Sequence, residues 1–97
     1  MRWLLPCAAL VAALCAGCTE ERATAEQCER IFDRLVALEL REMGFRDPEL
    51  TRRRQAELRA RHRDEIHACV GRRLTPDAVR CVEAAESAEE LNHDCLR

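Results

Sequence analysis

Two short stretches of this 97-residue chain carry side chains that could do chemistry. Cys15 and Cys18 have the Cys-x-x-Cys spacing of redox dithiols and of half a zinc site. The second stretch is HRDEIH, in which His62 and His67 flank two acids. A zinc-protease helix needs its two histidines four residues apart, with Glu directly after the first. Here the histidines are five apart and Arg63 follows the first, so we interpret them as surface histidines and predict no metal site.

The first eighteen residues have the layout of a secretory signal peptide. They begin with one Arg after Met1, continue as an apolar run from Trp3 to Ala16, and end in small residues. The run is about fourteen residues long, shorter than the roughly 20 that a membrane-spanning helix needs. A chain that begins this way is expected to be exported as a lipoprotein, with an ordinary secreted protein or a retained anchor as the alternatives.

The three residues AGC that end at Cys18 resemble the lipobox of bacterial lipoproteins, in which two small residues precede the cysteine that is lipidated. The resemblance implies that residues 1–17 are removed as a signal peptide and that Cys18 becomes the lipidated N-terminus. Cys15 then leaves with the signal peptide, so the Cys-x-x-Cys is absent from the mature protein. Thr19 stands where an Asp commonly signals inner-membrane retention, which implies delivery to the outer membrane of a diderm bacterium. More than one acyl chain would anchor the protein stably.

We predict that residues 18–24 form a lipidated polar tether and that residues 25–97 form one helical domain. Start and stop signals divide this domain into segments. The predicted helices run from the Thr24 capping box to Gly44, from Asp47-Pro48 to about residue 70, from Thr75-Pro76 onward, and from the Ser87 capping box onward. No stretch alternates as a strand does. The predicted fold is therefore all-α, a small bundle of two helical hairpins with about four helices.

The first predicted helix is apolar over an arc of about 200°, which is wider than one buried face requires. We therefore expect it to be the central helix, with the second helix on one side and the third and fourth on another. The apolar residues available for the core are Cys28, Ile31, Phe32, Leu35, Val36, Leu38, Leu40, Met43, Leu50, Leu58, Ile66, Cys69, Val70, Leu74, Val79, Cys81, Val82, Ala85, Leu91 and Leu96.

Four cysteines remain in the mature chain beside Cys18, namely Cys28, Cys69, Cys81 and Cys95. An even number of cysteines in a small exported domain indicates disulfides. Residues equally far from a hairpin turn face each other, which favours Cys28 with Cys69 and Cys81 with Cys95. The alternative pairing, Cys69 with Cys81 and Cys28 with Cys95, stays open. The spacings match no zinc pattern, so we do not expect metal ligands or redox thiols here.

The composition and the missing motifs exclude several functions. The formal net charge of −2 and an aromatic content of 3% argue against a nucleic-acid partner. The chain has no glycine-rich phosphate loop, and its one serine, Ser87, is expected to cap a helix rather than act as a nucleophile. We therefore predict no catalytic residue, no enzymatic activity and no cofactor.

The segment from residue 41 to residue 73 carries ten Arg against six acids. We predict an interaction face on the second helix, formed by Arg52, Arg53, Arg54, Arg59, Arg61 and Arg63. Such a face suits an envelope protein or an anionic membrane surface. The alternative is a solvated helix surface whose charges are neutralised by neighbours, as Glu57 and Arg61 would do.

The layout as a whole resembles a group of small, four-cysteine, all-helical bacterial lipoproteins of uncharacterised function. The resemblance rests on the lipobox and on the stretches CERIFDRLVALE, IHACV and VRCVEAAESAEELNHDC. It implies a helical fold, an outer-membrane location and no catalytic residue.

The expected function is that of a membrane-anchored, non-catalytic interaction or structural module of the cell envelope. Its expected contacts are the membrane, through the N-terminal lipid, and an envelope protein; the sequence indicates no oligomeric state. One alternative is a binder of lipid or another small apolar ligand, which predicts a cavity under Phe32 and Leu35. The other alternative is a thiol redox protein, which predicts free thiols in the mature chain.

Overall fold

A computed structural model describes residues 21–96. The predicted signal peptide, the lipidation site at Cys18, the first part of the predicted tether and Arg97 lie outside these residues. The elements are α2 (Ala25–Glu42), α3 (Pro48–Arg61), α4 (Arg63–Cys69), α5 (Pro76–Ala84), α6 (Ala88–Glu90) and the π-helical turn η2 (Leu91–Cys95). Residues 21–96 contain no strand apart from one isolated bridge, so the predicted all-α class is confirmed.

The helices start at the predicted caps. The Thr24 hydroxyl accepts from the Gln27 N–H, and the Gln27 side chain accepts from the Thr24 N–H, which completes the predicted capping box. Thr75 caps α5 in the same way, by accepting from the Ala78 N–H. At α6 only half of the capping box forms. Ser87 accepts from the Glu90 N–H, but the Glu90 carboxylate accepts from the N–H of Glu86 instead of that of Ser87.

Gly44 ends α2 as predicted. Its φ of 94° lies in the left-handed region, which glycine adopts without a steric penalty. The Gly44 N–H donates to the Arg41 carbonyl, and the Phe45 N–H donates to the Leu40 carbonyl. These two bonds form a Schellman motif, which satisfies carbonyls that the end of a helix leaves unpaired.

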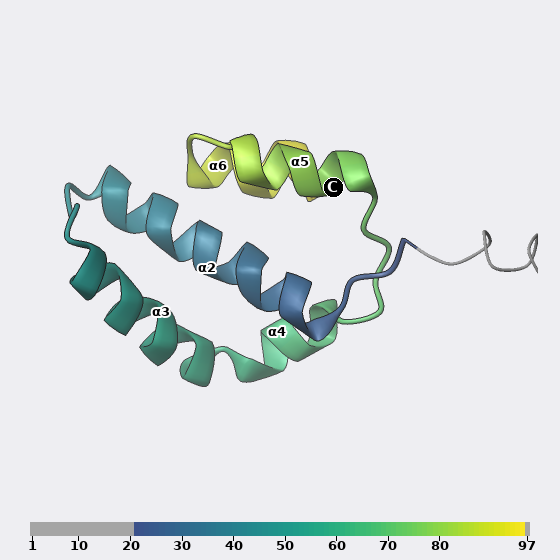
Figure 1. Cartoon of the computed structure of the whole chain (residues 1–97), viewed down its shortest axis with the longest axis horizontal. Coiled ribbons are helices and arrows are strands. Elements are labelled where there is room, and N and C mark those ends of the chain that lie inside the picture. Colours follow the sequence, from purple (N-terminus) through teal and green to yellow (C-terminus); the bar gives the residue numbers. More distant parts are fainter. Residues whose placement is uncertain (1–20, 97) are drawn as a thin grey trace, which may run out of the picture.

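The predicted helix from residue 48 to residue 70 is two helices, and this part of the prediction is wrong. The chain leaves helical geometry at His62, which has φ −108° and ψ 30°. The His62 ring lies 5.7 Å from the Phe32 ring, between their centroids, and its Nδ1 lies 3.0 Å from a Glu65 carboxylate oxygen. The break turns α4 toward the start of α2 (Figure 1), where Cys69 meets Cys28. Tertiary contacts therefore bend the chain at a position without Gly or Pro.

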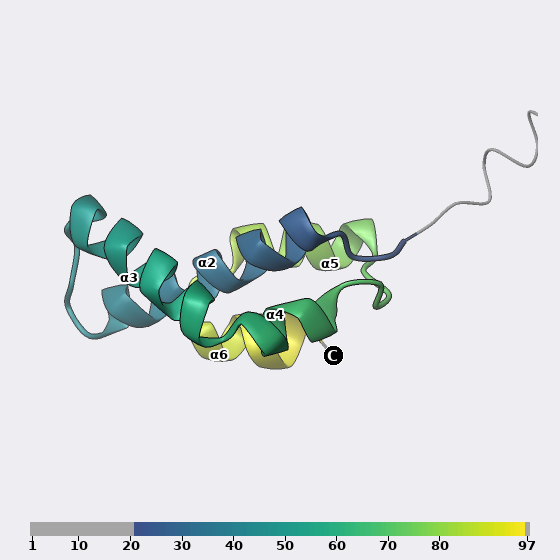
Figure 2. The same cartoon turned by 90° about the horizontal axis from the view of Figure 1, so that it is seen from below.

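The α2 helix lies at the centre of the structure. In Figure 1, α3 and α4 lie along one side of α2, and α5 and α6 lie along the other, as the wide apolar arc predicted. Figure 2 shows that α4 and the α6 end of the chain project to the same side of α2. The core joins α2 to the C-terminal half of the chain, and its buried residues are Leu38, Val82, Ala85, Leu91 and Cys95.

The two sides of α2 are packed unequally. The α3 helix contributes no buried residue, because its apolar stripe is thin and its remaining positions are charged or small. Three residues expected in the core are instead exposed: Met43, Val70 and Leu96 keep 64%, 39% and 40% of their surface open to solvent. Each is the residue directly after the end of a helix.

Part of the predicted tether packs on the helical domain. Arg22 and Arg73 form an antiparallel bridge, and the Ala23 N–H donates to the Arg72 carbonyl over 2.7 Å. The Gly71 N–H donates to the Ala23 carbonyl, and Ala23 is 5% exposed. The described part of the tether therefore closes one end of the domain against the loop between α4 and α5.

Candidate functional site

The four cysteines of the described chain form two disulfides. Cys28 pairs with Cys69 at a Cα–Cα distance of 6.0 Å, and Cys81 pairs with Cys95 at 5.4 Å. These are the pairs that equal distance from the hairpin turns favoured. The first disulfide fastens α4 to the first turn of α2, and the second fastens the C-terminal turn to α5. Residues 21–96 therefore hold no free thiol.

The histidines do not gather into a metal site. His62 contacts Phe32 and Glu65, while His67 and His93 are exposed. Within residues 21–96, no group of three or more His, Cys, Asp or Glu side chains is placed to hold a metal ion.

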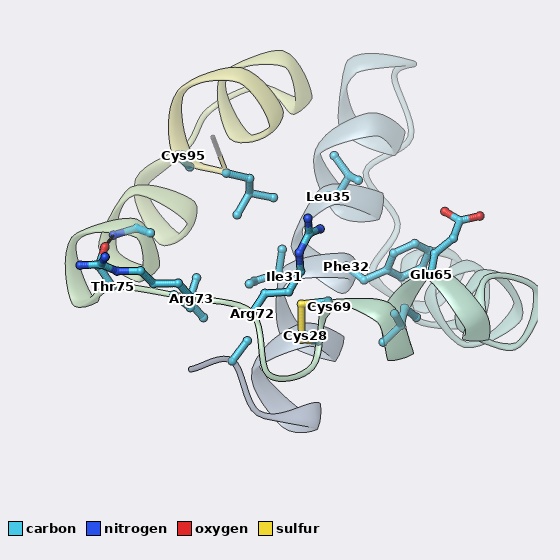
Figure 3. Close-up of a pocket in the computed structure, with 15 residues that line it drawn as sticks. Cys28, Ile31, Phe32, Leu35, Glu65, Cys69, Arg72, Arg73, Thr75 and Cys95 are labelled. Atoms are coloured by element: carbon cyan, nitrogen blue, oxygen red, sulfur yellow. Dashed lines mark hydrogen bonds between the residues drawn. A yellow bond between two sulfur atoms is a disulfide. The ribbon is translucent and has the colours of Figure 1, made fainter. Parts of the chain in front are cut away.

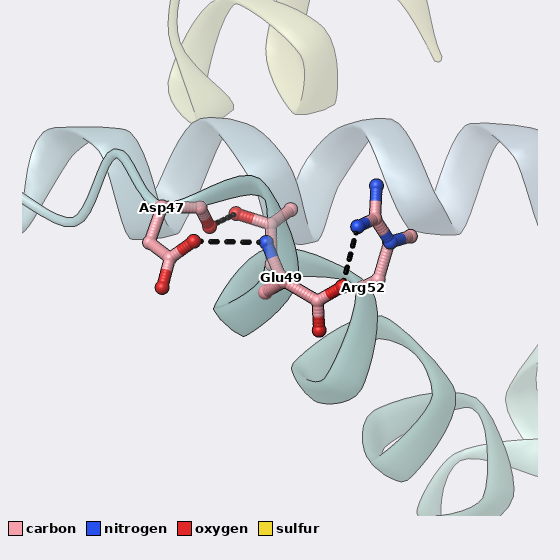
Figure 4. Close-up of polar contacts among 4 residues, drawn as sticks. Asp47, Glu49 and Arg52 are labelled. Carbon is pink, nitrogen blue, oxygen red and sulfur yellow. Dashed lines mark hydrogen bonds and ion pairs between the residues drawn. The ribbon is translucent and has the colours of Figure 1, made fainter.

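Three of the six arginines in the predicted interaction face pair with acids of their own helix. Figure 4 shows Asp47 capping α3 and Arg52 reaching Glu49, with 2.8 Å between nitrogen and oxygen. Glu57 pairs with Arg54 at 3.1 Å and with Arg61 at 3.4 Å. Exposed pairs of this kind contribute little to stability, about 0.3–0.5 kcal/mol each.

Arg59 belongs to the interior of the hairpin rather than to the predicted face. Its guanidinium lies 2.6 Å from the Asp33 carboxylate of α2, and about a third of each side chain is exposed. Gln55 donates to the Asp33 backbone carbonyl over 2.9 Å, one helical turn earlier on α3. This ion pair and this hydrogen bond hold α3 against α2, because the apolar stripe of α3 is thin.

Arg53 and Arg63 are exposed and have no ion-pair partner among residues 21–96. Successive positions on a helix are 100° apart, so Arg52, Arg53 and Arg54 span about 200° of α3 and do not share one face. The structure therefore leaves two separate unpaired guanidiniums on this surface in place of a continuous six-residue face.

A groove of about 630 Å³ lies beside the first half of α2. Its walls come from α4, from the loop after Gly71, and from the C-terminal end of the chain. Figure 3 shows Ile31, Phe32 and Leu35 along the α2 side of the groove. The apolar lining is completed by Ile66, Leu74 and Leu96. The groove lies where the ligand-binder alternative expects a cavity, under Phe32 and Leu35.

Both disulfides contribute to this groove. Cys28 and Cys69 line it at one end and Cys95 lines it at the other (Figure 3). The first disulfide holds α4 against α2 and the second holds the C-terminal turn against α5, so each bond fixes one part of the groove wall. Pre-formed sites of this size and apolar character are typical of small-molecule binding.

The polar groups of the groove were not singled out in the sequence. Arg72 and Arg73 lie on one wall and Glu65 on another. The sequence feature that could have indicated them is the pair of arginines directly after Gly71, in a loop that joins two disulfide-bonded hairpins. Their proximity to α2 depends on the backbone pairing with residues 21–23, which no local pattern encodes.

No protein-family model, curated protein or solved structure matches this chain. Among residues 21–96, no helix combines the length and the apolar character needed to cross a membrane.

Proposed function

We propose that this protein is an exported envelope lipoprotein, anchored through Cys18, that acts as a non-catalytic binding module. The observation that carries the proposal is the pairing of all four described cysteines into two disulfides, since such bonds persist in oxidising compartments. The resemblance of the first eighteen residues to a lipoprotein signal supports the anchor and the outer-membrane location. The helical domain then stands at the membrane surface, with its open groove and its unpaired arginines available for binding.

The anchor predicts a defined mass for the protein extracted from membranes. We expect a chain that begins at Cys18 and carries a lipid-sized increment, and we expect no alkylation of Cys28, Cys69, Cys81 or Cys95 without reduction. Intact-mass spectrometry of the non-reduced protein, with and without alkylating reagent, measures both. A Cys18→Ala chain is the matched control and should lack the increment. An unmodified N-terminus would contradict the anchor, and alkylation of two or more thiols would restore the redox alternative.

An envelope protein as partner predicts that charge on α3 matters. Reversing Arg52, Arg53 and Arg54 to Glu should reduce cross-linking to that partner at least tenfold, because rim charges steer association. A photo-reactive residue in place of Arg63 supplies the cross-link, and mass spectrometry identifies the captured chain. Replacement of the same three residues by Lys keeps the charge and should retain most of the signal. Equal capture by the Glu and Lys variants would contradict a contact through this surface.

A second function, the binding of a small apolar ligand, is favoured by the groove. Ile31, Phe32 and Leu35 line the groove and are only half-buried in the described chain. Clefts of a few hundred Å³ with apolar walls and few polar groups are the usual form of small-molecule sites. This function and the protein contact on α3 use different surfaces, so they are compatible.

A further inference from the structure

An unpaired cation lies over the apolar floor of the groove. Figure 3 shows the Arg72 side chain crossing the groove toward Leu35, while Arg73 extends away beside Thr75. Arg73 pairs with Glu21 at 3.4 Å, whereas the Arg72 guanidinium has no ion pair or hydrogen bond within the described part of the chain. A guanidinium carries five donors in a fixed plane, and Arg72 is exposed, so these donors are accessible to a ligand in the groove. Its position is suited to an anion that arrives with the ligand.

We infer that the groove binds a fatty acid, with part of the acyl chain on the apolar floor and the carboxylate on Arg72. The inference rests on the ligand-binding function proposed above and names its ligand class.

The charges around the groove favour a ligand whose head group is a carboxylate. One planar guanidinium matches one carboxylate through two parallel hydrogen bonds. Glu65 lies on another wall of the same groove and adds a negative charge. Its carboxylate faces His62 Nδ1 at 3.0 Å and stays at the rim. A doubly charged head such as a phosphate monoester would meet this repulsion with only one unpaired arginine to offset it.

The apolar part of the groove selects an acyl chain over an extended peptide. Its α2 side runs from Cys28 to Leu35, which is about 10 Å of helix at 1.5 Å per residue. Most of the residues that line the groove are aliphatic, aromatic or disulfide-bonded cysteine, and the four polar ones are Glu65, Arg72, Arg73 and Thr75. An extended peptide would leave its own N–H and C=O groups unpaired against such walls, which is unfavourable. A hydrocarbon chain brings no such groups and gains from each methylene that it buries.

Photo-labelling of the full protein in envelope preparations tests the inference. The probe is palmitic acid with a mid-chain diazirine and a terminal alkyne, and the control probe is the matching primary alcohol. We expect light-dependent labelling by the acid in tryptic peptides from residues 31–41 and 64–72, at least fivefold above labelling by the alcohol. Labelling confined to other peptides would overturn the inference, and so would capture of a protein by the groove in place of the probe.

The head group is tested with Arg72→Gln, and Arg46→Gln serves as the control because Arg46 is also exposed, has no ion pair within residues 21–96 and lies outside the groove. We expect Arg72→Gln to reduce labelling by the acid at least fivefold and Arg46→Gln to leave it unchanged. Resistance of the four cysteines to alkylation shows that each variant is folded. Unchanged labelling of a folded Arg72→Gln protein would overturn the role of Arg72.

The outcomes separate this inference from the function on which it rests. If acid and alcohol label the groove equally, apolar-ligand binding stands and the fatty acid is wrong. If neither labels the groove, both are wrong. The mass of the Cys18 peptide, read from the same digest without light, reports the anchor independently.

Discussion

Removal of the Cys28–Cys69 disulfide, in a Cys28→Ala/Cys69→Ala double variant, should lower the free energy of unfolding by about 4 kcal/mol. The bond joins residues 41 positions apart, and the chain-entropy estimate grows with the logarithm of that separation. The side of α2 that it fastens has no buried residue from α3 to compensate. For a domain of this size, the midpoint of thermal unfolding should fall by about 15–30 °C.

The Cys81→Ala/Cys95→Ala variant is the matched control. Its cysteines are only 14 positions apart, and the same estimate gives about 3 kcal/mol. Calorimetry of the two variants and of the parent protein under non-reducing conditions measures the difference. A larger loss from the shorter loop would show that apolar packing, rather than chain entropy, decides which disulfide matters more.

The starts of α2, α3 and α5 and the end of α2 could be predicted because their causes are local. Thr24, Asp47 and Thr75 each satisfy N–H groups two or three residues away, and Gly44 provides a left-handed backbone directly after its helix. These interactions need no distant partner, so the sequence alone displays them. The favoured cysteine pairing followed from the same boundaries, since the turns determine which residues face each other.

The break at His62 could not be predicted, because its causes are distant in sequence. Phe32 supplies the ring that His62 contacts, and Asp33 supplies the carboxylate that turns Arg59 inward. The Cys28–Cys69 bond then requires α4 to approach the first turn of α2. Helix propensity depends on the local sequence and includes none of these contacts, so it predicts one continuous helix over residues 48–70.

The groove was predictable only in part. The wide apolar arc of α2 indicates that more than one face is covered, whereas a cavity under Phe32 and Leu35 is expected only if the protein binds an apolar ligand. The position of Arg72 in the groove could not be predicted, because its approach to α2 depends on the bridge between Arg22 and Arg73. Pairing of two irregular segments leaves no periodic pattern in the sequence.

A Leu38→Ala substitution should lower the free energy of unfolding by about 3–5 kcal/mol. Leu38 is 1% exposed and belongs to the cluster that joins α2 to Val82, Ala85 and Leu91. Removal of three carbons there loses their burial and leaves a cavity, because the Cys81–Cys95 bond limits how far the surrounding elements can collapse. The total stability of a small domain is about 5–15 kcal/mol, so the loss is a large share of it.

Met43→Ala is the matched control, since it also truncates an apolar side chain of the same helical hairpin. Met43 is 64% exposed, so its truncation should change the free energy of unfolding by no more than about 0.5 kcal/mol. Urea unfolding of the disulfide-intact proteins, with the slope compared between variants, separates a change in stability from a change in the unfolded state. A loss from Leu38→Ala as small as that from Met43→Ala would contradict a core between α2 and the C-terminal hairpin. The two disulfides would then be the main source of stability, and the helices would owe their positions to covalent bonds rather than to packing.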